Sequence, residues 1–228
     1  MTSATQTPDR LTALQAELAR HPHGRVPREL RRRQVLELAT TLFSERGFAA
    51  ASMDELASRA GVSKPVIYDL FGSKDGVLIA AIDELGLELN ETVRTAVAGR
   101  SGPEDLLTAG SLAFFRFIGE RSDTWAMIFS TARSLSDATP TASAKLDEIR
   151  RRQDGLVSAV LLAAAHELGG EPDPLEVSAI TRGLNGVFEG MVEWWAEHPE
   201  VEAERLAGWV VGLVLPGLEA MAEANAGS

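Results

Sequence analysis

The chain has 228 residues, of which 45% are hydrophobic and 24% are charged, and its formal net charge at pH 7 is −11. These values suit a soluble globular protein of one or two domains that can bury a sizeable core. The lack of cysteine excludes disulfides, thiolate metal sites and cysteine nucleophiles.

The negative charge is unevenly distributed along the chain. Residues 24–76 hold nine Lys and Arg against seven Asp and Glu, a net charge of +2, whereas residues 77–228 carry −13. Phosphate contacts need local cations rather than a basic protein as a whole. The asymmetry therefore favours a nucleic-acid-binding role for residues 24–76.

Helical periodicity runs through the whole chain, and no hairpin signal lies between alternating apolar runs. The sequence therefore predicts an all-α fold of about nine helices. Residues 1–23 form an N-terminal tail in which a short helix over 10–20 and disorder are both open, and we assign the tail no role. The first strong helix is expected over 27–46, because its apolar residues lie on one side and Gly47 follows it.

Two short helices are expected next, over 53–60 and 64–71, with a turn at Gly61 between them. Ser52 precedes the first of these helices and Glu55 follows three residues later, which is the pattern of a capping box. Longer helices are then expected over 74–98, 103–119, 122–135, 139–168, 173–197 and 201–222.

The two short helices have the side chains that a helix-turn-helix motif needs. Ala57 leaves room for the second helix to pack on the first, and Gly61 tolerates a positive φ in the turn. The residues expected to face inward are Leu56, Ala60, Val62, Ile67 and Leu70. The outward positions of the second helix are Ser63, Lys64, Tyr68 and Asp69. Their hydroxyl, ammonium and phenol groups favour DNA contact over a generic helical hairpin.

From about Arg31 to Asp83 the sequence resembles the TetR family of regulators. The matching segments are residues 42–48 (LFSERGF), 52–57 (SMDELA), 61–63 (GVS) and 67–75, in which Ile-Tyr, Phe, Ser, Lys and Asp recur at the family's spacing. The sequence departs from the family at Leu70, where His or Tyr is frequent, and at Asp69, where an aromatic residue or Arg is frequent.

The resemblance implies a DNA-binding head of three helices over residues 24–76, with the helix 64–71 in the major groove. It places Ser63, Lys64, Pro65 and Tyr68 at the DNA, and it gives Ser52 and Lys74 phosphate contacts at helix N-termini. A further basic group opens the first helix, and contact with DNA and a solvated helix face are both open for it: Arg28, Arg31, Arg32 and Arg33.

For residues 77–228 the resemblance implies ligand binding and dimerisation, with the homodimer contact over about 173–222. The apolar stripes of those last two helices also fit an internal core. The candidate pocket residues, for which ordinary core is the alternative, are Phe114, Phe117, Trp125, Phe129, Asn185, Phe188 and Trp194. Few polar residues interrupt these faces, so the implied effector is a small apolar or amphipathic molecule.

The expected function is that of a repressor that binds a palindromic DNA operator as a homodimer and is released by its effector. The two heads would read major grooves about one turn apart, ~34–36 Å. The alternative is a helical ligand- or protein-binding module whose head does not read DNA. Its best support is Asp69, an anion on the outward side of the second short helix.

We expect no enzymatic activity, metal or cofactor. The four His residues lack the spacing of metal ligands on a helix, and the chain has neither a glycine-rich phosphate loop nor a Gly-x-Ser-x-Gly elbow. Residues 1–23 lack the apolar stretch of a secretion signal, and the longest apolar run, 156–165, is too short to cross a bilayer. We therefore expect a cytoplasmic protein without membrane contact.

Overall fold

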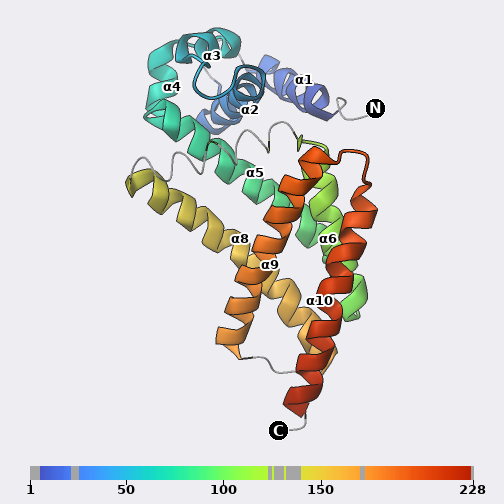
Figure 1. The fold of residues 1–228 in the computed structure, drawn as a ribbon. Helices are drawn as coiled ribbons and strands as arrows, with labels where there is room; N and C mark the ends of the chain where they lie inside the picture. The colour runs from blue at the N-terminus through green and yellow to red at the C-terminus, as the bar shows by residue number, and fades with distance from the viewer. Residues whose placement is uncertain are drawn as a thin grey trace. The chain divides into compact units, whose positions relative to one another are not determined.

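The computed structural model describes residues 6–21, 26–122, 125, 131, 140–169 and 173–226. Over these residues the chain forms nine α-helices and no strand (Figure 1). The all-α fold predicted from the sequence is confirmed for this part of the chain. The helix predicted over 122–135 lies almost entirely outside the described residues, and so does Phe129.

The chain divides into two compact units. The first comprises Met1–Leu85 and Glu120–Leu146, and the second comprises Gly86–Gly119 and Asp147–Ser228. Both helices that cross the division, α5 (Lys74–Val97) and α8 (Pro140–Glu167), contribute residues to each unit. The functional division predicted between residues 76 and 77 remains a prediction.

In the first unit, the first four helices pack in succession, each against its neighbour in the chain. Helix α1 (Gln6–Ala19) contacts α2 (Arg28–Arg46), α2 contacts α3 (Met53–Ala60), and α3 contacts α4 (Lys64–Phe71). The predicted apolar stripe of the first strong helix is the centre of this unit, since these side chains are almost completely buried with others from α3, α4 and α5: Val35, Ala39, Leu42, Phe43, Leu56, Ile67, Val77 and Leu78. Helix α1 lies within the predicted tail, and its Leu14 is also buried.

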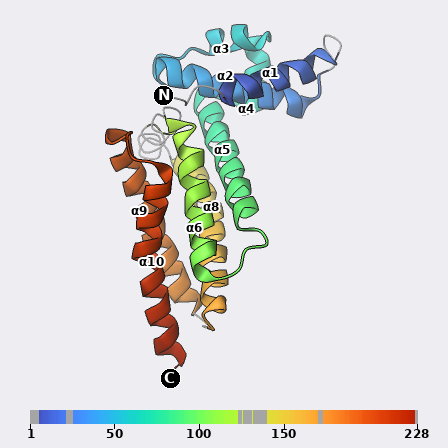
Figure 2. The same cartoon turned by 90° about the vertical axis from the view of Figure 1, so that its right-hand side faces the viewer.

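In the second unit, α6 (Pro103–Gly119) and α10 (Ala203–Ala226) form the most extensive helix pair, and α9 (Pro174–Glu197) contacts α10 (Figure 2). Their shared core also takes residues from α8, and it consists of Leu107, Phe115, Leu161, Ala164, Leu184, Leu206, Ala207, Val210, Val211, Val214 and Leu218. Helical spacing explains the contribution of α10, whose buried residues recur every three or four positions.

The segment Ala203–Glu223 of α10 is long and apolar enough to cross a membrane by length and composition, with a mean hydropathy of 1.4. This segment was not predicted from the sequence, where 156–165, a run that contains Ser158, was taken as the longest apolar run. These criteria alone are weak evidence, because a core helix of a soluble protein also meets them. Here six residues of the segment belong to the buried core of the second unit.

Candidate nucleic-acid interface

The turn between α3 and α4 has a conformation that depends on glycine. Gly61 adopts φ 62° and ψ 35°, the left-handed region that residues with a Cβ avoid. The amide of Gly61 donates to the carbonyl of Ser58 at 3.2 Å, and the amide of Val62 donates to the carbonyl of Ala57 at 3.1 Å. These two bonds form a Schellman motif, which ends α3 and directs the chain into α4.

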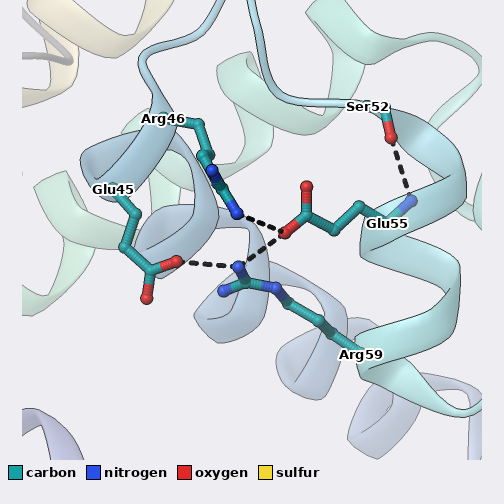
Figure 3. Close-up of polar contacts among 5 residues, drawn as sticks. All are labelled: Glu45, Arg46, Ser52, Glu55 and Arg59. Atoms are coloured by element: carbon teal, nitrogen blue, oxygen red, sulfur yellow. Dashed lines mark hydrogen bonds and ion pairs between the residues drawn. The ribbon is translucent and has the colours of Figure 1, made fainter.

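The N-terminus of α3 is capped by Ser52, as predicted. Its Oγ accepts a hydrogen bond from the amide of Glu55 at 3.0 Å (Figure 3). In a full capping box the side chain of Glu55 would also accept from the amide of Ser52. Here Oε1 of Glu55 instead accepts from Arg59 at 2.6 Å and lies 3.9 Å from Nη2 of Arg46. Arg59 also bonds Glu45 at 2.7 Å, so the network ties α3 to the last turn of α2.

This network affects the ionisation of its members. The hydrogen bond from Arg59 holds the pKa of Glu45 below its usual value, and the bond to Glu45 raises the pKa of Arg59. Both side chains therefore stay charged across the neutral range. The same contacts join α3 to the last turn of α2.

Helix α4 has one buried side chain and a largely exposed surface. Ile67 is completely buried, whereas Val66 and Tyr68 are 38% and 42% exposed. The hydroxyl of Ser63 makes no capping bond, and it is exposed beside the first turn of α4. The sequence-based list of outward residues did not include Val66. Successive residues of a helix point about 100° apart, so the residue before the buried Ile67 could have been expected to face away from the core.

Three predicted DNA-contacting side chains lie near the loop before α3. Nζ of Lys64 lies 2.9 Å from Oδ2 of Asp54, two residues beyond Ser52. Nζ of Lys74 donates to the carbonyl of Ala49 at 3.1 Å. The structure thus brings Ser52 close to the first turns of both α4 and α5. Tyr68 is exposed one turn further along α4, and Pro65 is exposed in its first turn.

The two lysines have different surroundings. The hydrogen bond to Asp54 raises the pKa of Lys64. Partial burial lowers the pKa of Lys74, whose ammonium lies 4.6 Å from the centre of the Phe48 ring, while the nearby Asp75 opposes that shift. The ordinary pKa of a lysine side chain, from which both shifts are taken, is 10.5.

Arg28 joins the start of α2 to the last turn of α4. It forms an ion pair with the carboxylate of Asp69, and its Nη2 donates to the backbone carbonyl of Asp69 at 2.9 Å. The last carbonyls of a helix lack partners within the helix, so this bond caps α4 as well as neutralising its anion. The negative charge of Asp69, which was the best support for a head that does not read DNA, is therefore balanced by Arg28.

The other arginines predicted at the start of the first helix differ in their contacts. Arg31 bonds Gln34, and Arg32 bonds Glu84 at 3.3 Å and lies 5.9 Å from the centre of the Phe71 ring. Arg33 is exposed, and no ion pair or hydrogen bond of its side chain occurs with the described residues. Of this group, Arg33 best fits an additional phosphate contact.

The predicted pocket residues of the second unit do not all lie together. Phe114 and Phe188 are in contact, with ring centroids 4.7 Å apart, and Phe117 is buried. Trp194 is 40% exposed and packs against Trp209 on the outer side of α9. Trp125 is buried but belongs to the segment grouped with the first unit.

Two hydrogen-bonded pairs join α8 to α9 beside these aromatic rings. Asn185 donates to Asp154, and the hydroxyls of Ser158 and Thr181 lie 2.8 Å apart. The members of each helix are four residues apart, so the pairs are successive contacts of two antiparallel helices. Of these residues, only Asn185 was predicted from the sequence as a site residue. Within the described ranges, no group of three or more His, Cys, Asp or Glu side chains could hold a metal ion.

A serine-capped helix, a glycine turn and a second helix that buries one side chain and exposes most of its surface define a helix-turn-helix protein. The family described as "Bacterial regulatory proteins, tetR family" matches residues 35–81. The chain is 42% identical over 106 residues to the transcriptional activator FasR from Mycolicibacterium smegmatis, a match that covers 46% of this chain and 48% of FasR.

Two further similarities extend beyond the head. The chain is 28% identical to the transcriptional regulator EthR from Mycolicibacterium smegmatis over 75% of this chain and 78% of EthR. A TetR-like regulator from Rhodococcus sp. RHA1 has a similar structure, with a TM-score of 0.61 and 28% identity over 85% of this chain and 98% of that chain. The chain belongs to the TetR family of transcriptional regulators.

Proposed function

We propose that the chain is a cytoplasmic homodimeric repressor that binds a roughly palindromic DNA operator and is released by a small apolar or amphipathic effector. The observation that carries the proposal is the exposed surface of α4, on which Ser63, Pro65 and Tyr68 stand free of the core beside Lys64. A helix that buries only Ile67 retains most of its surface for a partner.

The chemistry of this surface suits the major groove. The phenol of Tyr68 can donate to a phosphate while its ring contacts a thymine methyl, and Val66 adds a second apolar contact of that kind. The N-termini of α3 and α5 present free amides to phosphates, with Ser52 and Lys74 beside them. These groups come from one unit, and the Arg59 network holds two of its helices together.

The proposed dimer contact is the exposed face of α9 and α10. Trp194, Trp209 and Leu213 are 40%, 43% and 64% exposed, and the two Trp rings lie 5.9 Å apart. Glycines along the same helices would let a second copy approach closely, since a Cβ at any of them would meet no other part of the described chain within 4 Å: Gly183, Gly186, Gly190, Gly208, Gly212 and Gly217. Exposed apolar helix faces of this kind mark protein contacts.

The proposed effector site is the aromatic region between α6 and α9. Phe114, Phe115 and Phe188 supply apolar surface, and the pair Asn185–Asp154 supplies hydrogen-bonding groups beside it. An effector that displaces helices here can act on the head through α5, which runs through both units. Repression is proposed as the direction of control, and because FasR is named as an activator, the test must measure transcription as well as binding.

The test is fluorescence anisotropy of labelled DNA from the region flanking the gene, at two salt concentrations. Wild type is compared with Tyr68→Ala and Lys74→Ala. The control is Arg100→Ala, which removes an exposed cation of the second unit that pairs with Asp105. We expect selective binding that weakens with salt, is lost in both head variants and survives in the control. A reporter gene behind the same DNA gives the sign of regulation.

A folded dimer that selects no sequence from a genome-wide DNA library would overturn the proposal. That result would favour a ligand- or protein-binding module in its place. Selective binding that persists in both head variants would leave the regulator in place but exclude this face of α4 as its reading surface.

A further inference from the structure

We infer that Asp54 competes with DNA phosphate for Lys64 and so sets the affinity of the head for any DNA. The inference rests on the proposed function, which places Lys64 at the DNA, and it adds that the partner of Lys64 in the complex is a phosphate. It concerns the strength of binding rather than the choice of sequence. In the free protein the carboxylate occupies the place at the ammonium that a phosphate oxygen takes in the complex.

The geometry supports an exchange of partners. Nζ of Lys64 donates to Oδ2 of Asp54 at 2.9 Å and links the first turn of α4 to the first turn of α3. The two side chains are 41% and 74% exposed, so a phosphate oxygen can reach the ammonium without opening the fold. The hydrogen bond raises the pKa of Lys64, and the ammonium therefore stays charged before and after the exchange.

The strength of the pair also suits an exchange. Ion pairs between exposed side chains are weak, because water screens them and both side chains lose freedom, so a phosphate can displace Asp54. After the exchange the freed carboxylate remains two residues from Ser52, where the proposal places another phosphate. Asp54 thus opposes binding twice, through the lost ion pair and through repulsion in the complex.

A second feature separates this role from a purely structural one. Asp54 lies in the first turn of α3, where a negative charge favours the positive end of the helix. Replacing it with a neutral residue removes that contribution, so a structural role predicts lower stability and unchanged or weaker DNA binding. Competition predicts that Asp54→Asn binds DNA more tightly in spite of any loss of stability.

The experiment measures DNA affinity and thermal stability of the full-length dimer for wild type, Asp54→Asn, Lys64→Ala and the double variant. Operator and random-sequence duplexes are used over a range of salt. Asp54→Asn is expected to bind both duplexes more tightly by the same factor, about 3-fold per head and about 10-fold per dimer. A plot of the logarithm of its binding constant against the logarithm of salt concentration should be steeper than that of wild type by up to about 0.9 per head. In wild type the carboxylate freed from Lys64 takes up a cation from solution, and Asp54→Asn has no such carboxylate.

The double variant separates competition from simple repulsion. With Lys64 absent, only the repulsion of Asp54 remains to be relieved, so Asp54→Asn should give a smaller gain than it gives in wild type. Equal gains in the two backgrounds would overturn the competition. The matched control Asp105→Asn removes an equally charged partner of an exposed ion pair in the second unit and should leave affinity unchanged.

The outcomes distinguish this inference from the proposed function. Selective binding by wild type with no gain in Asp54→Asn would overturn the inference and leave the regulator intact. A gain confined to the operator would also overturn it, because phosphate contacts carry no sequence information. No binding to either duplex by wild type at low salt would overturn both.

Discussion

The two units of the chain are built from the same kind of helix but expose different surfaces. In the first unit the exposed helix α4 presents Pro65, Val66 and Tyr68 together with the ionic groups Lys64 and Asp69, which have partners from α3 and α2. In the second unit the exposed faces of α9 and α10 present Trp194, Trp209 and Leu213. The first surface suits a hydrated anionic partner, and the second suits an apolar one.

The difference shows that burial alone does not identify a functional surface in a helical protein. Both units leave large side chains outside their cores. They differ because the charged groups on α4 have partners within the protein, whereas the apolar side chains on α9 and α10 remain partly exposed to water. A surface with balanced charges can remain in water without a partner. An apolar surface with open glycines gains free energy only when another surface covers it.

The largest expected effect comes from a charge on the apolar surface. Leu213→Asp should weaken self-association by more than about 100-fold, since a symmetric dimer loses two buried leucines, each contributing about 1.5–3 kcal/mol, and acquires two unpaired carboxylates. Analytical ultracentrifugation measures the effect. The matched control is Leu87→Asp on α5, at a leucine that is 47% exposed but lies outside α9 and α10.

If Leu213→Asp and Leu87→Asp dimerise equally well, the exposed face of α10 is not the contact. The exposed apolar face of the second unit would then need another partner. DNA binding should follow dimerisation in these variants, because two heads on one duplex bind far more tightly than one.

A smaller effect is expected in the first unit, from the pair that neutralises α4. Arg28→Ala leaves the carboxylate of Asp69 unpaired on the surface proposed to meet DNA and removes the bond to its carbonyl. An exposed pair contributes up to about 1 kcal/mol per head, so two heads should lose roughly 10-fold in operator affinity. Anisotropy titration with operator DNA measures the loss.

The double variant Arg28→Ala with Asp69→Asn separates charge from position. Recovery of most of the affinity would show that neutralisation of Asp69 is what matters. No recovery would show that Arg28 acts by holding the end of α4 in place. Unchanged affinity in Arg28→Ala itself would contradict both roles.

The sequence predicted α2, α3 and α4 well because their signals are local. The bounds of α3 and α4 follow from Ser52, Gly61 and Gly72, each of which acts within a few residues. The ends of the longer helices that the structure describes were likewise predicted to within a few residues, mainly from Pro and Gly. The family resemblance added the proposed roles of the exposed residues, which periodicity alone does not supply.

What the sequence did not predict are contacts between distant positions. Arg28 and Asp69 are 41 residues apart, and Arg116 pairs with Glu204 across 88 residues. The pair Asn185–Asp154 depends on how α8 packs against α9, which no local pattern encodes. Trp194 illustrates the same point. It was assigned to the pocket because it is aromatic, but in the structure it is 40% exposed and contacts Trp209 of another helix.

Ser52 allows capping to be separated from phosphate contact. Ser52→Ala should lower the free energy of unfolding by about 1 kcal/mol, because the amide of Glu55 loses its acceptor. Ser52→Asp keeps an acceptor there and should be as stable as wild type, yet it places an anion where a phosphate is proposed to bind. Urea denaturation and operator titration on the same samples measure the two roles. Normal DNA binding by Ser52→Asp would exclude the phosphate contact.

The smallest expected effect is a pH dependence in the network that joins α2 to α3. The hydrogen bond from Arg59 holds the pKa of Glu45 below its usual value of 4.5 in the folded state. Between the two pKa values the unfolded chain binds more protons, so this contribution is present above about pH 4.5 and is lost as the pH falls through the lower, folded value. Because Glu45 is exposed, solvent screening keeps the contribution below about 0.5 kcal/mol.

Urea denaturation at pH 6 and at pH 3.5 tests this dependence. The loss of stability between the two pH values should be slightly smaller in Glu45→Gln than in wild type. The control Glu17→Gln removes an exposed carboxylate of α1 in the same unit, and its loss should match that of wild type. If Glu45→Gln shows the full wild-type loss, then Arg59 is satisfied by Glu55 alone, and α3 is held to α2 by the apolar contacts around Leu56 rather than by charge.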